Sequence, residues 1–153
     1  TMAQIELKQV EKRFGEFQAV QPMDLTIKDG EFVVLLGPSG CGKTTTLRMI
    51  SGLEAVTGGK IHIGDQDVTW HNPDDRDIAF VFQLYALYPH MTVEQNIIFP
   101  LQAQKASKEV IQSRLKHVVD LLQIKQLLPL KPGNLSGGDK QRVALGRALV
   151  RKP

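Results

Sequence analysis

The eight residues Gly37 to Thr44 read GPSGCGKT and match the pattern G-x-x-x-x-G-K-[S/T] at every fixed position. The glycines let this stretch, here called the phosphate loop, bend so that backbone N–H groups turn inward around phosphate oxygens. A helix that follows the loop adds its positive N-terminal end. Lys43 supplies a cation for the terminal phosphates, and the Thr44 hydroxyl is placed to ligate Mg²⁺. The sequence therefore predicts a nucleotide-phosphate site.

A second stretch, LSGGDKQR from Leu135 to Arg142, has the residue types of a phosphate-contacting helix start. Ser136 is a good N-cap, Gly137 and Gly138 expose backbone amides, and Asp139 completes a capping box. Taken alone, this signature stretch is equally well explained as an ordinary well-capped helix. The guanine-reading pattern N-K-x-D is missing from the sequence, which argues against a GTPase.

Together the two stretches resemble the ATP-binding-cassette (ABC) transporter family, and the resemblance covers essentially the whole chain. It implies ATP and Mg²⁺ as cofactors. It also implies a homodimer or a paired cassette subunit, in which the signature stretch of one subunit closes over ATP held by the phosphate loop of the other. The residues that it implies for ATP binding are Phe14, Gly37, Pro38, Ser39, Gly40, Cys41, Gly42, Lys43, Thr44, Thr45, Ser136, Gly137 and Gly138.

The resemblance assigns roles to two further residues. Gln83 matches a glutamine that approaches Mg²⁺ and the attacking water, so Lys43 and Gln83 are the expected catalytic residues and Thr44 and Gln83 the expected metal ligands. Phe14 matches an aromatic residue that stacks on adenine. The residues themselves leave alternatives open. Without the resemblance, Gln83 would be interpreted by default as a strand-terminal glutamine in a turn, and Phe14 equally well as a buried strand aromatic.

The stretch RDIAFVFQLYALYPHMTVEQNIIFPL is especially similar to ATPases of bacterial carbohydrate importers of the maltose and glycerol-phosphate type. It implies an ATP-hydrolysing importer subunit, peripheral on the cytoplasmic face of the inner membrane, that never touches the transported sugar or sugar phosphate. Residues Gln83 to His90, here called the contact segment, are where such subunits meet integral membrane permeases. Importers of polyamines, iron or sulfate carry close variants and stay as alternatives. Cassette proteins of DNA repair or translation fit the motif spacing and the contact segment less well.

One residue departs from the family pattern, because Asp139 stands where the signature usually has glutamine. A carboxylate near a triphosphate should repel it, although an acidic residue also suits the start of a helix. We expect at most a weakened contact with ATP across the dimer.

The family continues, after residues equivalent to ALVRKP at the end of this sequence, into the Walker B strand with its acidic pair. The 153 residues therefore resemble the N-terminal part of a cassette. On their own they are expected to hydrolyse no ATP and to be unstable as a monomer, since Phe32 to Leu36 would lack a neighbouring strand. A truncated, non-hydrolysing nucleotide-binding fragment is the alternative function.

Composition is that of a globular protein, and it narrows the function classes. The single cysteine, Cys41, excludes an internal disulfide and fits a reducing compartment. The net charge of +3 is spread along the chain, which argues against a nucleic-acid partner. Residues 1–4 show no signal-peptide pattern, and Met2 is the expected natural start.

Hydrophobic periodicity predicts an α/β fold: a P-loop NTPase core with an N-terminal antiparallel β subdomain and a helical subdomain, incomplete at the C-terminus. The expected domains are residues 1–87 and 136–153 for the nucleotide-binding core and 88–135 for the helical subdomain. The expected strands cover residues 4–14, 23–31, 32–36, 58–68 and 77–83, and the expected helices cover 43–51, 107–122 and the stretches after Thr92 and Ser136.

Overall fold

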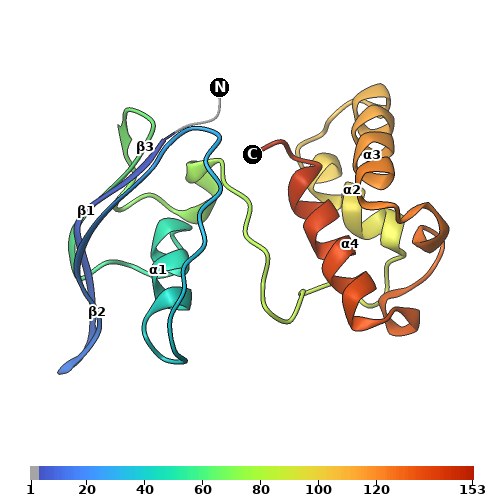
Figure 1. Ribbon diagram of the computed structural model, residues 1–153. Helices are drawn as coiled ribbons and strands as arrows, with labels where there is room; N and C mark the ends of the chain where they lie inside the picture. Colours follow the sequence, from blue (N-terminus) through green and yellow to red (C-terminus); the bar gives the residue numbers. More distant parts are fainter. Residues whose placement is uncertain (1–3) are drawn as a thin grey trace. The chain divides into compact units, whose positions relative to one another are not determined.

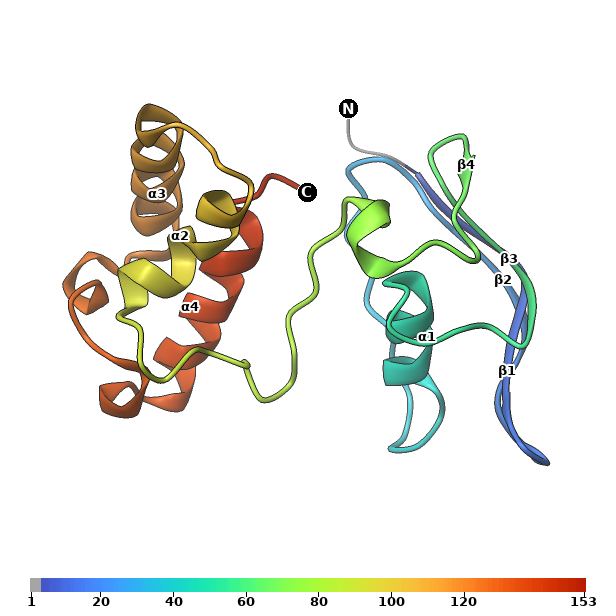
Figure 2. The same cartoon turned by 180° about the vertical axis from the view of Figure 1, so that it is seen from behind.

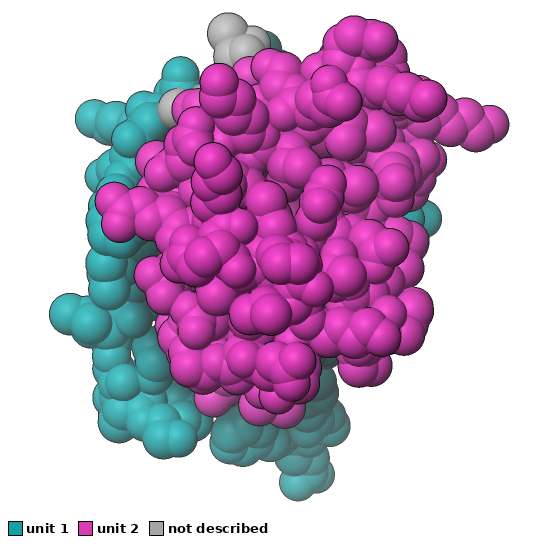
Figure 3. Space-filling view, turned by 90° about the vertical axis from the view of Figure 1, so that its right-hand side faces the viewer, with its two compact units in different colours: residues 1–78 teal, residues 79–153 magenta. Residues whose placement is uncertain are grey.

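The computed structural model describes residues 4–153, which form two units divided between Ile78 and Ala79 (Figures 1 and 3). The expectation that Met2 is the natural start lies outside the described residues. Each unit has its own hydrophobic core, so each is described by itself.

The first unit is built on an antiparallel sheet with the strand order β2-β1-β3-β4. This confirms the predicted N-terminal antiparallel β subdomain. The β1 strand lies in the middle and pairs with β2 on one edge and with β3 on the other. The strands are β1 (Ile5–Phe14), β2 (Phe17–Ile27), β3 (Gly58–Ile63) and β4 (Gln66–Asp67).

Helix α1 (Lys43–Ile50) contributes Met49 and Ile50 to the core of this sheet (Figure 2). The predicted helix over residues 43–51 is confirmed to within one residue. Gly52, with φ of +76°, ends it in the left-handed conformation that glycine adopts without steric cost.

Buried Arg76 closes the C-terminal end of α1, from the short 3₁₀ helix η1 (Pro73–Arg76). Its Nη1 donates to the carbonyl oxygens of Met49 and Ile50, at 2.9 Å each. Its remaining nitrogens donate to the carbonyls of Thr69 and His71. The guanidinium thereby satisfies carbonyls at the end of the helix, and its charge is favourable beside the negative end of the helix dipole.

Two predicted strands are wrong in this structure. The run Phe32–Leu36 is not part of a strand, and Phe32 and Leu36 are 91% and 88% exposed. Residues 77–83 likewise belong to no strand. The reason is that a strand exists only with a hydrogen-bonded neighbour, and no strand of residues 4–153 pairs with either run. The exposure of Phe32, Val34 and Leu36 agrees with the expectation that this run lacks a neighbour.

The second unit consists of three main helices, and the predicted N-caps at Thr92 and Ser136 are confirmed, whereas the N-cap Ser107 was not named from the sequence. The capping box predicted for Asp139 is wrong, because its carboxylate accepts from the Ser136 hydroxyl and from Arg142 instead of from the Ser136 backbone N–H. Thr92 and Gln95 form a complete capping box, and Ser107 and Ser136 each accept a backbone N–H of the first turn. The elements are α2 (Val93–Ala103), α3 (Lys108–Leu122), η2 (Lys125–Leu127), η3 (Pro132–Asn134) and α4 (Gly137–Leu149).

Close packing joins α4 to the other helices of this unit. A Cβ added to Gly146 would lie 3.2 Å from side-chain carbons of both Val118 and Leu122 on α3. Buried residues of α2, α3 and α4, among them Ile97, Val118 and Val143, share one core. The predicted domain division, with 136–153 grouped with the core and 88–135 separate, stays a prediction. Among residues 4–153, no helix is both long and apolar enough to cross a membrane.

We predict that Arg76→Met in the full-length protein lowers the free energy of unfolding by about 3 kcal/mol, because buried carbonyls lose a charged donor. The matched control is Arg48→Met, an exposed arginine in the last turn of the same helix, for which a change within about 0.5 kcal/mol is expected. Urea denaturation measures both. Equal losses for the two variants would contradict this role of Arg76.

Candidate nucleotide-binding site

The phosphate loop connects the run Phe32–Leu36 to α1. Gly40 and Gly42 have φ of +81° and +91°, which places both in the left-handed region. A Cβ added to Gly42 would lie 2.7 Å from the carbonyl oxygen of Ala19 on β2. Glycine at position 42 is therefore required twice, by the backbone conformation and by the close approach of the sheet.

The N-terminus of α1 offers free hydrogen-bond donors. Its N-cap is Gly42, and no side chain of residues 4–153 caps it. The first turn, Lys43 to Thr45, has no intrahelical acceptors for its N–H groups, whereas Thr46 N already donates to Gly42 O at 2.8 Å. Unsatisfied donors at the positive end of a helix dipole suit an anion such as phosphate.

Lys43 folds back over the loop that precedes it. Its Nζ donates to the carbonyl oxygens of Gly37 and Pro38, at 2.7 and 2.6 Å, and lies 3.3 Å from Cys41 Sγ. The ammonium is thus held within the arc of the loop, where it can meet a phosphate oxygen.

The exposed hydroxyl of Thr44 follows directly and offers a neutral oxygen ligand, of the kind that Mg²⁺ accepts together with phosphate oxygens and water. Its place at the start of α1 fits a metal ion shared with a phosphate. In residues 4–153, no group of three or more His, Cys, Asp or Glu side chains gathers as a metal site.

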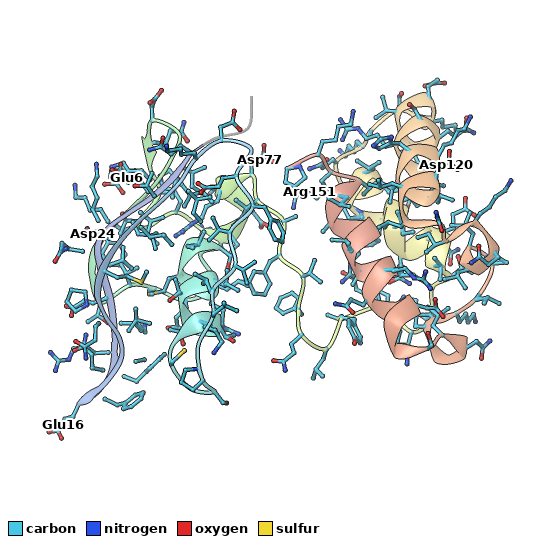
Figure 4. The ribbon with its side chains drawn as sticks, in the orientation of Figure 1. Glu6, Glu16, Asp24, Asp77, Asp120 and Arg151 are labelled. Atoms are coloured by element: carbon cyan, nitrogen blue, oxygen red, sulfur yellow. The ribbon has the colours of Figure 1, made fainter. Side chains whose placement is uncertain are left out.

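Phe14 lies at the end of the β1–β2 hairpin, beside the turn that carries Glu16 (Figure 4). The alternative of a buried strand aromatic is wrong, because Phe14 is 48% exposed. The Lys12 ammonium lies 4.8 Å from the ring centroid and is itself held by Glu54 at 2.6 Å. A cation near the ring is a favourable arrangement, and the exposed ring can stack on a planar ligand.

The remaining predicted site residues belong to the second unit. Gln83 is exposed in a turn, and Ser136, Gly137 and Gly138 are exposed at the start of α4. A Cβ added to either glycine would meet nothing within 4 Å, so packing in this chain does not require them. Glycine costs a helix up to about 1 kcal/mol relative to alanine, so two glycines without a packing role indicate close approach of another group.

Asp139 interacts with Ser136, the N-cap residue of its own helix. The Ser136 hydroxyl accepts the backbone N–H of Asp139 at 3.1 Å and donates to its carboxylate at 2.6 Å. Arg142 also pairs with the carboxylate. These hydrogen bonds, that of Ser136 foremost, lower the pKa of Asp139, so the group is ionised at neutral pH. The departure from glutamine therefore places a negative charge, partly balanced by Arg142, at the signature.

Asn96 is a residue that the sequence analysis missed. It is fully buried, accepts the backbone N–H of Tyr88 and donates to the carbonyls of Tyr88, Met91 and Thr92. It thereby holds the end of the contact segment against α2. The available signal was weak: Asn96 lies at helical spacing from Val93 and Pro100 and directly before the apolar run Ile97–Leu101, so a polar side chain falls on the apolar side of the helix.

The comparisons with known proteins agree on one family. The sequence profile of the ABC transporter family matches residues 20–153. The chain belongs to the ABC transporter family. The predicted fold class is confirmed by two dimeric structures of the cassette MJ0796, one of them a post-hydrolysis state bound to ADP and Pi. They align with TM-scores of 0.85 and 0.86 at 34% and 35% identity, over 97% of this chain and 70% of theirs.

Curated relatives from this ABC transporter family are similar over 99% of the chain. They include the trehalose/maltose import ATP-binding protein MalK of Thermococcus litoralis, at 58% identity, and the osmoprotective compounds uptake ATP-binding protein GgtA of Synechocystis, at 55%. An sn-glycerol-3-phosphate import ATP-binding protein UgpC of Agrobacterium fabrum is 54% identical. The chain spans 42–43% of the length of these relatives.

We predict that ATP protects Cys41 from thiol reagents, because this exposed side chain lies inside the phosphate loop. In the full-length protein, maleimide labelling at Cys41, located by peptide mapping, should slow at least tenfold when the loop is saturated with ATP. AMP, which lacks the terminal phosphates, is the matched control and should protect little. Labelling that ignores ATP would count against the whole loop assignment.

Proposed function

We propose that the full-length protein is the ATP-binding and ATP-hydrolysing subunit of a bacterial importer, and that the imported substrate is a sugar or a sugar phosphate. The observation that carries the proposal is the phosphate loop, with Lys43 held inside its arc and the N–H groups of α1 uncapped behind it. The substrate class is supported by the relatives named for import of trehalose, maltose and glycerol 3-phosphate. Importers of polyamines, iron and sulfate have similar motifs. A transport assay with those substrates therefore distinguishes them from sugars and sugar phosphates.

Each site residue has a distinct task in this proposal. The loop amides and Lys43 bind and neutralise the terminal phosphates of ATP, and Phe14 stacks on the adenine ring. Thr44 and Gln83 would hold Mg²⁺, which supplies further charge neutralisation when it is bound. The amide side chain of Gln83 also orients the water that attacks the terminal phosphate.

The proposed partners follow from the second unit. The exposed Ser136, Gly137 and Gly138 contact ATP held by a second cassette subunit, so hydrolysis needs a dimer. The contact segment, Gln83 to His90, meets an integral membrane permease. The protein is then peripheral at the cytoplasmic face of the inner membrane, without direct contact with the cargo.

The test of this function is the Lys43→Met variant, compared with wild type in the full-length protein. We expect ATP affinity to fall at least tenfold and hydrolysis to fall below detection, because an ion pair with the phosphates is lost. Lys116→Met, an exposed lysine on α3, is the matched control and should leave both unchanged. Binding of ATP by wild type without hydrolysis would instead favour the non-hydrolysing module.

A further prediction concerns the charge at the signature. Asp139→Gln and Asp139→Asn should each tighten ATP-dependent dimer closure by about twofold to fivefold, because both remove a carboxylate near the triphosphate. Analytical ultracentrifugation with a hydrolysis-deficient background measures closure. Unchanged ATP dependence in both variants would show that the carboxylate does not repel the nucleotide.

A further inference from the structure

Two consecutive residues of the contact segment have an unusual backbone conformation. Tyr85 and Ala86 have φ of +64° and +48°, and neither is a glycine or an asparagine. Side chains with a Cβ rarely adopt this left-handed region, and each such residue costs free energy unless its surroundings impose it. Some neighbouring group must therefore hold this part of the segment.

That group is the guanidinium of Arg147, in the last turn of α4. Its Nη1 donates to Ala86 O at 2.8 Å and its Nη2 donates to Tyr85 O at 3.0 Å. Its Cζ lies 5.4 Å from the centroid of the Tyr88 ring. The planar fork of arginine thus satisfies both left-handed carbonyls at once and contacts a ring two residues further on, which a lysine could not reproduce.

The guanidinium makes these contacts in a partly buried place. Burial lowers the pKa of Arg147, and the Tyr88 side chain acts in the opposite direction, yet an arginine remains protonated. Hydrogen bonds from a charged donor are stronger where water is partly excluded.

The other side of the segment is held by α2. Tyr88 exchanges two hydrogen bonds with buried Asn96, and its ring lies 4.9 Å from the ring of Phe99. Asn96 holds only the backbone of Tyr88 and residues after it, so Tyr85 and Ala86 depend on Arg147. The segment is therefore tied to two helices, with α4 responsible for its left-handed part.

The same helix carries the signature at its other end. Ser136 caps α4 and Arg147 follows eleven positions later, which corresponds to about 16 Å along a helix axis. We propose that Arg147 is a positioning residue that latches Tyr85–Tyr88 to α4, so that a displacement of α4 at the signature end moves the contact segment with it. This latch rests on the proposed function, which supplies both the event that displaces α4 and the partner that the contact segment meets.

Hydrogen exchange of the full-length protein tests the latch without any nucleotide. The amides of Tyr85, Ala86 and Tyr88 all donate within the second unit, so their exchange reports local opening. Arg147→Met should accelerate exchange of residues 85–88 about tenfold or more, and Arg147→Lys should give a smaller acceleration. The Lys variant keeps the test decisive where the Met variant does not fold.

Arg114→Met is the matched control. Arg114 also donates to two backbone carbonyls beside α4, those of Val150 and Arg151, and neither carbonyl belongs to the contact segment. It should leave exchange of residues 85–88 unchanged. Equal acceleration in the Arg114 and Arg147 variants, or wild-type exchange in both Arg147 variants, would overturn the latch.

Transmission is tested by repeating the measurement with ATP. In wild type, ATP should change exchange of residues 85–88, and in Arg147→Lys this change should be reduced while ATP affinity at the phosphate loop stays the same. An ATP-induced change of wild-type size in the Lys variant would overturn transmission through Arg147. Absence of ATP binding in wild type would instead refute the proposed function. The hydrogen-exchange comparison without nucleotide would still show whether Arg147 holds residues 85–88.

Discussion

Backbone hydrogen bonding is the constraint on which the rest of the first unit depends. The β1 strand is paired along both edges, which satisfies its backbone, and apolar side chains of the sheet such as Leu7 and Val10 share a buried core with Met49 and Ile50 of α1. Gly42 approaches the carbonyl of Ala19 on that sheet, and Arg76 satisfies the carbonyls at the other end of the helix. The phosphate loop is thus positioned by a helix that is held at both ends.

In the second unit, side chains satisfy backbone groups that lie outside strands and helices. Its irregular segments place backbone polar groups where no strand or helix can satisfy them. Asn96 and Arg147 supply the missing donors and acceptors, from α2 and α4 respectively. Because α4 is also packed closely against α3 at Gly146, the helix that begins at the signature is tied to every other main element of its unit.

The candidate site was predictable to different degrees for physical reasons. The phosphate loop and the N-caps at Thr92 and Ser136 depend on residues within a few positions of one another, so their pattern is visible in the sequence. Arg76 could not be assigned in this way, because its carbonyl partners Met49 and Ile50 lie 27 and 26 positions away. The sequence around an arginine such as Arg76 does not show whether the side chain is solvated or buried.

The sequence by itself determined the family, the phosphate loop, the helices, the N-caps at Thr92 and Ser136 and the antiparallel sheet, since each follows from local residue types or from alternating polarity. Only the tertiary structure decided which apolar runs become strands. Phe32–Leu36 has the composition of a buried strand, but Phe32, Val34 and Leu36 are exposed, because a strand needs a neighbour and residues 4–153 provide none for it. Tertiary structure also decided that Phe14 is exposed and that Arg147 meets two left-handed carbonyls, since partners distant in sequence are chosen by packing.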